Sequence, residues 1–350
     1  MTEPLTESAT HINEGQDAPL RVVFDHLGGP EVLDLVPFTL APLAPGHVRI
    51  GVRAIGLNRF EALFRRDHYV ISPQLPAAMG VEGVGVITET AAGVNEFAVG
   101  ERVAVLPIHS PVVGTGTYAT HADIPVEALV RVADTSTDED EAATWMASLQ
   151  AYNLATKVPI GSGDTVIVTA ATSSVGAALV QIAHDFGASV IATTRTTVRK
   201  GELLRRGADL AVAADDEDLA EAVRDFTNGR GATVVYDTVG GTLLNTLLAA
   251  TAEFGHVLSY GAQTSPDIRA ARIDLPLMAL DRRSVSFVDL FEMVESPERL
   301  AAAKTYIADA RRRGALRIPI DRVLDFEEVA EAHRVLESGR LAGKVILHVS

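Results

Sequence analysis

The sequence predicts an α/β protein of two domains, a β-rich barrel-like domain and a doubly wound parallel sheet. Its 350 residues exceed the roughly 150 expected of one ordinary domain. Near Glu141 the pattern changes from short apolar runs broken by Gly and Pro to a regular alternation of strand and helix signals. These two observations predict a domain boundary close to that residue, with a cleft between the domains.

The first part of the chain, residues 20–132, carries strand signals. Apolar residues alternate with polar ones in short runs, and turns such as residues 44–46 separate these runs. The runs cover residues 21–24, 47–52, 84–87 and 102–105. This spacing is typical of a small β-barrel.

From residue 141 onward strands alternate with helices, as right-handed crossovers between parallel strands require. Strands are predicted at residues 164–169, 189–193, 209–212, 232–236, 256–259 and 284–288. Helices are predicted at residues 175–186, around 203–204, at 219–226 and at 243–251. This order predicts the Rossmann dinucleotide-binding architecture. Two further helices, at residues 298–313 and 326–337, and a strand at 344–347 are expected to return to the first domain.

The composition disfavours several classes of function. The chain has no cysteine, which removes disulfides, thiol nucleophiles and cysteine-ligated metal sites. Its formal charge of -16 disfavours nucleic acid as a partner, and no apolar stretch approaches the ~20 residues of a membrane span. Residues 1–19 lack the features of a secretory signal, so we expect a flexible tail on a cytoplasmic protein. The acidic runs 138–141 and 215–218 are expected to be solvated starts of amphipathic helices.

A turn of small residues between a predicted strand and a predicted helix is the first functional signal. A helix N-terminus attracts a pyrophosphate through its free N–H groups and its dipole, and small side chains let the anion approach. Of the glycines in the G-x-G-x-x-G pattern only Gly176 is kept, but the strand before it and the helix after it supply the right context. The alternative is an ordinary turn without a ligand. The residues expected to hold the pyrophosphate are Thr172, Ser173, Ser174, Val175 and Gly176.

The end of the second predicted Rossmann strand distinguishes between the two nicotinamide cofactors. NAD enzymes carry Asp or Glu there to bind the ribose 2′-hydroxyl. This chain instead has Thr194, Arg195 and Arg199, a hydroxyl and two cations that suit a 2′-phosphate. The sequence therefore predicts NADPH rather than NADH.

With these features the sequence resembles the medium-chain dehydrogenase/reductase superfamily, specifically its zinc-free quinone oxidoreductase branch. The resemblance runs from Leu20 onward and is carried by residues 56–61 (GLNRFE), 80–85 (GVEGVG), 99–103 (VGERV), 170–176 (AATSSVG), 236–240 (YDTVG) and 343–346 (GKVI). It implies a GroES-like catalytic domain at residues 20–146, a Rossmann NADPH-binding domain at 147–289 and a return to the catalytic domain at 290–350.

The resemblance also implies the type of chemistry. Zinc alcohol dehydrogenases of this superfamily hold the catalytic zinc by Cys, His and Cys, and matching the motifs puts Asn58, Val81 and Met146 at those positions. None of these is a strong zinc ligand, so no metal is expected. Without a Lewis acid, hydride should pass to an acceptor that is already electrophilic, a quinone or an α,β-unsaturated carbonyl compound.

Several cofactor contacts follow from the resemblance alone. Lys344 and Arg59 match basic residues that lie near the pyrophosphate in the superfamily. The backbone at Val239, Gly261 and Leu290 matches the nicotinamide contacts at the ends of the later strands.

Three polar residues are the candidates for catalysis. Asn58 and Tyr69 match residues of the substrate pocket in quinone reductases, and either is expected to bind the substrate oxygen or the nicotinamide. Tyr69 is a candidate proton donor, with an aromatic wall as the alternative role. Gln150 stands where the family usually has Thr, and we expect it to share the ribose and substrate hydrogen bonds with Asn58.

Two other functions stay open. One is an enoyl reductase acting on carrier-bound thioesters, which a basic patch at the mouth of the cleft would favour; residues 311–313 are the candidate patch. A cofactor-bound structural or RNA-binding protein is disfavoured by the acidic charge. A homodimer is expected through the sixth strand, residues 284–288, because an apolar sheet edge would otherwise be exposed.

Overall fold

The computed structural model describes residues 18–108, 116–133, 135–261, 279 and 282–350. Within these residues one sheet has six parallel strands in the order β11-β10-β9-β12-β13-β14. They are β9 (Thr165–Val168), β10 (Ser189–Thr194), β11 (Leu210–Ala213), β12 (Ala232–Asp237), β13 (Thr251–Ser259) and β14 (Ser284–Phe287). Because every neighbouring pair is parallel, the predicted doubly wound sheet is confirmed.

Two of the helices between these strands begin at a side chain that caps them. The helix α3 (Ser174–Asp185) follows Ser173, whose Oγ accepts a hydrogen bond from the N–H of Gly176 at 3.1 Å. The helix α5 (Leu219–Phe226) follows Asp218, so the acidic run 215–218 does lead into a helix with one buried face. The helices α4 (Lys200–Arg205) and α6 (Leu243–Ala250) form the crossovers from β10 to β11 and from β12 to β13.

The second large sheet combines strands from both ends of the chain. It comprises β15 (Ile320–Asp325), β16 (Lys344–His348), β3 (His47–Gly56), β5 (Gly83–Thr90), β6 (Arg102–Val105), β7 (His121–Pro125) and β8 (Leu129–Arg131). A smaller sheet of β1 (Leu20–Phe24), β2 (Asp34–Pro37) and β4 (Ala77–Ala78) shares its hydrophobic core. Since β16 pairs with β3, the C-terminal strand lies in the same sheet as the N-terminal half of the chain.

Two helices cover this part of the molecule near the C-terminal strand. They are α1 (Arg59–Arg65) and α10 (Val329–Glu337), which pack against each other. Among the described residues, no helix combines the length and the apolar character that crossing a membrane requires.

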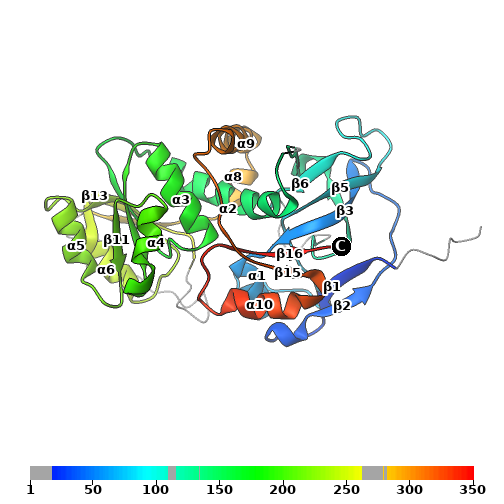
Figure 1. The fold of residues 1–350 in the computed structure, drawn as a ribbon, viewed down its shortest axis with the longest axis horizontal. Helices are drawn as coiled ribbons and strands as arrows, with labels where there is room; N and C mark the ends of the chain where they lie inside the picture. The colour runs from blue at the N-terminus through cyan, green and yellow to red at the C-terminus, as the bar shows by residue number, and fades with distance from the viewer. Residues whose placement is uncertain (1–17, 109–115, 134, 262–278, 280–281) are drawn as a thin grey trace, which may run out of the picture.

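A long central helix, α2 (Asp138–Lys157), lies between the half of the molecule that contains the parallel sheet, the Rossmann half, and the half that contains the other two sheets, the barrel half (Figure 1). It packs against α3 on one side and β3 on the other, and α9 (Pro297–Arg312) lies beside it, preceded by α8 (Phe291–Val294). The expectation of a solvated start at residues 138–141 is wrong for Glu141, whereas Asp138, Glu139 and Asp140 are partly exposed in the first turn. Most residues of α2 from Glu141 to Ala155 are buried. The Glu141 side chain is 1% exposed, and its carboxylate binds Arg311 at 2.7 Å.

Candidate active site

A large cavity of about 1590 Å³ is lined by residues from both halves of the molecule. The Rossmann half contributes residues at the carboxyl ends of β9, β10, β12, β13 and β14, where open α/β sheets bind their ligands. The barrel half contributes the start of α1 and the segment before β16. All of the predicted site residues except Gly176 and Gly261 line this cavity.

The turn from β9 into α3 forms the middle of the cavity wall. A Cβ added to Gly176 would lie 2.5 Å from the carbonyl oxygen of Ala170, so only glycine lets the helix approach the strand this closely. Ala170 itself has a left-handed φ of 46°. The N–H groups of Ser174 and Val175 lie in the first turn of α3, where intrahelical acceptors do not exist. The turn therefore fits a pyrophosphate at this helix N-terminus.

Arginine side chains gather at the end of β10. The Arg195 guanidinium donates to the carbonyl oxygen of Gly339. That of Arg199 donates to the carbonyls of Arg340 and Leu341 and, at 3.4 Å, to the Glu202 carboxylate. Because a guanidinium has five N–H donors, both groups keep donors for an anion in the cavity. Arg340 also lines this end. Sequence reasoning missed Arg340, which belongs to none of the quoted motifs.

The ends of β12 and β13 present backbone to the cavity region. The N–H groups of Val239 and Gly240 both donate to the buried carboxylate of Asp237 at 3.0 Å, which fixes this turn. Burial raises the pKa of Asp237, and these hydrogen bonds oppose the rise. A Cβ added to Gly261 would meet Thr238 Oγ1 at 2.5 Å, so a side chain there would disturb the same turn.

Asn58 is held on all sides by buried groups. Its side-chain Nδ2 donates to Glu82 Oε1 at 3.0 Å and to the carbonyl of Gly56 at 3.3 Å, and its Oδ1 accepts from Lys344 Nζ at 2.7 Å. Its backbone N–H donates to Glu61, whose pKa burial raises to about 8. Both amide hydrogens of Asn58 thus have protein acceptors, and the capacity left toward the cavity is an oxygen lone pair.

Lys344 lies deeper than the resemblance implied. Its side chain is 1% exposed, and its ammonium group forms an ion pair with Glu82, whose other oxygen accepts the N–H of Met146 at 3.0 Å. The ammonium therefore neutralises a buried carboxylate behind the cavity wall. Sequence reasoning missed Glu82, although it lies inside one of the segments that carried the resemblance.

The three positions matched to zinc ligands, Asn58, Val81 and Met146, all line the cavity. They offer an amide, a hydrocarbon and a thioether, where Zn²⁺ requires thiolate, imidazole or carboxylate. In the part of the chain that the structure describes, no three His, Asp or Glu side chains gather as metal ligands would. The side chains at these positions do not fit a zinc ion.

Tyr69 and Gln150 lie on the part of the lining formed around β14 and α1. The Tyr69 ring packs on Phe60 with centroids 5.3 Å apart, and burial with the nearby Asp289 carboxylate raises the pKa of Tyr69 to about 12. Gln150 is buried on α2 and its Nε2 donates to the carbonyl of Val288 at 3.4 Å. Asp289, which the sequence did not single out, is the charged group beside the phenol.

Comparisons with known proteins agree with this architecture. Residues 44–134 match the alcohol dehydrogenase GroES-like domain, and residues 206–347 match the zinc-binding dehydrogenase family. A quinone oxidoreductase from Pseudomonas aeruginosa is 30% identical over 334 residues, which cover 93% of this chain and 98% of that protein. The structure of Escherichia coli quinone oxidoreductase complexed with NADPH matches with a TM-score of 0.86 and 25% identity, over 94% of this chain and 99% of that one. Mycoketide-CoA synthase from Mycobacterium tuberculosis is 32% identical over 345 residues, which are 95% of this chain but 8% of that protein.

Proposed function

Because the chain belongs to the quinone oxidoreductase branch of the medium-chain dehydrogenase/reductase superfamily, we propose that it is an NADPH-dependent reductase. Its acceptors are quinones or α,β-unsaturated carbonyl compounds, and no metal takes part. One observation carries the cofactor assignment. The helix N-terminus at Ser174 and the guanidinium groups of Arg195 and Arg199 line the same cavity. A dinucleotide with a 2′-phosphate is the ligand that uses both sites.

The catalytic roles are assigned to the residues at the β14 side of the cavity. When bound, NADPH supplies a hydride to a carbon of the acceptor. Tyr69 keeps its proton at neutral pH, because its pKa is raised to about 12. Its phenol therefore donates a hydrogen bond to the acceptor oxygen, or gives a proton to the carbon beside the carbonyl of an enone. The apolar side chains of Phe60, Val81 and Met146 exclude water from the same region.

The absence of metal assistance is inferred from the side chains at the matched ligand positions. Asn58 is already bound by Glu82, Gly56 and Lys344, and neither Val81 nor Met146 offers an anionic or imidazole ligand. A quinone or an enone needs no Lewis acid, because conjugation spreads the developing charge onto oxygen.

An enoyl reductase acting on thioesters is the second candidate, and the match to a segment of the long mycoketide-CoA synthase favours it. The basic residues 311–313 support it poorly. Arg311 binds Glu141, Arg312 binds Asp309, and Arg313 binds both Asp185 and Asp309. A run of cations that is already paired attracts an anionic carrier weakly.

We also propose that the protein is a cytoplasmic homodimer joined along β14. Among the described residues this strand is at the edge of the parallel sheet, and Phe287 on it, which also lines the cavity, is 54% exposed. Pairing with a second copy would bury this apolar edge. Sedimentation as a monomer at micromolar concentration would refute the dimer.

The experiment that tests the function is an acceptor panel with the purified protein. NADPH consumption is followed by absorbance with quinones, enones, enals and enoyl thioesters, in the presence of a chelator. The proposal expects turnover of quinones or enones at unchanged rates when the chelator is added. Turnover of enoyl thioesters alone would favour the second candidate.

A further inference from the structure

Two side-chain amides of α2 hold the backbone that follows β14. Gln150 and Asn153 lie three residues apart, so they share one face of the helix. Gln150 Nε2 donates to the carbonyl of Val288 at 3.4 Å, and Asn153 Nδ2 donates to the carbonyl of Asp289 at 2.8 Å. Successive carbonyls of one short segment are thus fixed by neighbouring side chains of one rigid helix.

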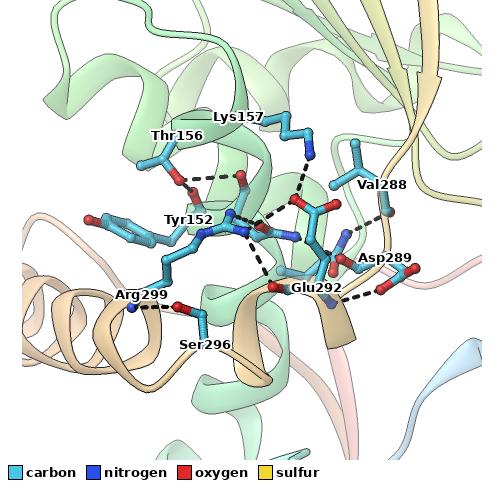
Figure 2. A network of polar contacts seen from close by, with 10 residues as sticks. Tyr152, Thr156, Lys157, Val288, Asp289, Glu292, Ser296 and Arg299 are labelled. Atoms are coloured by element: carbon cyan, nitrogen blue, oxygen red, sulfur yellow. Dashed lines mark hydrogen bonds and ion pairs between the residues drawn. The ribbon is translucent and has the colours of Figure 1, made fainter.

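The orientation of the Asn153 amide is set by a charged partner. Asn153 is fully buried, and its Oδ1 accepts from Arg299 Nη2 at 2.7 Å. Because a guanidinium only donates, it must face the amide oxygen and leaves Nδ2 directed at Asp289. Arg299 is held in turn by the backbone carbonyl of Glu292 at 3.3 Å and its carboxylate at 3.2 Å (Figure 2).

The held segment and Gln150 line the main cavity, but Asn153 and its partner Arg299 do not. Val288, Asp289 and Leu290 line the cavity, whereas Asn153 and Arg299 are not part of its lining. The segment follows β14, whereas the 2′-phosphate arginines follow β10, on the other side of the central strand β9. A dinucleotide whose pyrophosphate lies at α3, after β9, therefore has its nicotinamide half on the side of this segment.

We propose that Asn153 and Arg299 are positioning residues for hydride transfer. They fix the Val288–Leu290 backbone against which the nicotinamide lies, and they touch neither cofactor nor substrate. The inference rests on the proposed function, because it needs a nicotinamide cofactor in the cavity. It matters for rate, because hydride transfer depends on the placement of the reacting carbon within a fraction of an ångström.

The sharpest variant is Asn153→Asp, which keeps the shape and the acceptor for Arg299. It replaces the donor that faces the Asp289 carbonyl with an oxygen, so the contact becomes repulsive. We expect kcat/KM with NADPH to fall by at least about tenfold, because the buried carbonyl of Asp289 loses its hydrogen-bond donor. The affinity for adenosine 2′,5′-bisphosphate, which lacks the nicotinamide, should stay unchanged.

Matched control variants separate positioning from general damage to the helix. The Thr156 hydroxyl lies on the same helix and donates only to carbonyls of that helix, those of Tyr152 and Asn153. Thr156→Val should therefore leave kcat/KM unchanged. Arg299→Met frees the Asn153 amide, whereas Lys157→Met removes the other cation bound to Glu292 and leaves Arg299 in place. Only the first of these two should lower kcat/KM.

The readouts also separate failure of this inference from failure of the proposed function. Wild-type rates in both Asn153→Asp and Arg299→Met would overturn the inference, and so would an equal loss of affinity for NADPH and for the bisphosphate. Failure of the unchanged protein to reduce any acceptor would overturn the proposed function instead. The inference would then still be tested by binding alone. The ratio of the dissociation constants for NADPH and for adenosine 2′,5′-bisphosphate should change in Asn153→Asp and not in Thr156→Val.

Discussion

Replacing Arg195 and Arg199 together by alanine removes both cations proposed to bind the 2′-phosphate. Each guanidinium would lose a charge-assisted hydrogen bond to phosphate, worth about 1.5 to 3 kcal/mol. The lower end applies because the Arg195 side chain is exposed to solvent. Two such losses amount to about 3 kcal/mol, which corresponds to about 100-fold weaker binding of NADPH.

The assay is a titration of NADPH and, separately, of NADH, followed by nicotinamide fluorescence. NADH lacks the 2′-phosphate, so the double variant should bind it as the unchanged protein does. Arg206→Ala is the matched control, because Arg206 also donates to a carbonyl of the same segment, that of Ala342 at 2.8 Å, but does not line the cavity. It should leave the NADPH affinity unchanged.

Two results would show that these arginines do not recognise the 2′-phosphate. Unchanged NADPH affinity in the double variant would mean that the two guanidinium groups serve only to hold the carbonyls of residues 339–341 and, for Arg199, the Glu202 carboxylate. An equal loss for NADPH and NADH would mean that the arginines support the cavity without recognising the 2′-phosphate.

Three further predictions concern catalysis and stability. Tyr69→Phe should lower kcat with enones by about 100-fold while keeping the aromatic wall, and an unchanged kcat would refute the proton-donor role. The wild-type rate should show no titration of this phenol near neutral pH, because the pKa of Tyr69 is raised to about 12. Glu82→Gln should leave the Lys344 ammonium buried without a carboxylate, so the free energy of unfolding in urea should fall by about 3 kcal/mol or more. Glu89→Gln should cost little, because the Glu89 carboxylate is half-exposed and its partner Arg49 keeps Asp123. Burial lowers the pKa of His333 to about 3, below its unfolded value near 6.5, so the stability that the neutral imidazole contributes is complete above pH 6.5 and is lost as the pH falls toward 3. The free energy of unfolding of the wild type should therefore fall over that range more steeply than that of His333→Gln. Equal slopes in the two proteins would contradict this.

The order of strands and helices could be predicted because it follows from local patterns. The strand at residues 232–236, for example, is a short apolar run with β-branched side chains, and it is found as β12 (Ala232–Asp237). The helix cap at Ser173 and the close approach of α3 to the end of β9 at Gly176 likewise depend on residues that are neighbours in the sequence.

The side-chain partnerships could not be predicted, because they join distant parts of the chain. Lys344 and Glu82 are 262 positions apart, and Arg299 and Asn153 are 146 apart, so no spacing rule connects them. The burial of Glu141 was missed for the same reason. An acidic run at a helix start normally faces water, and its partner Arg311 lies 170 positions later.

The proposed reaction is reduction of the acceptor by NADPH without a metal. The most direct test measures metal content by mass spectrometry and quinone or enone reduction in the same chelator-treated sample. We expect full activity, a clear preference for NADPH over NADH and no stoichiometric zinc. Activity that disappears on chelation and returns with added zinc, or a protein that binds neither nicotinamide cofactor, would contradict it.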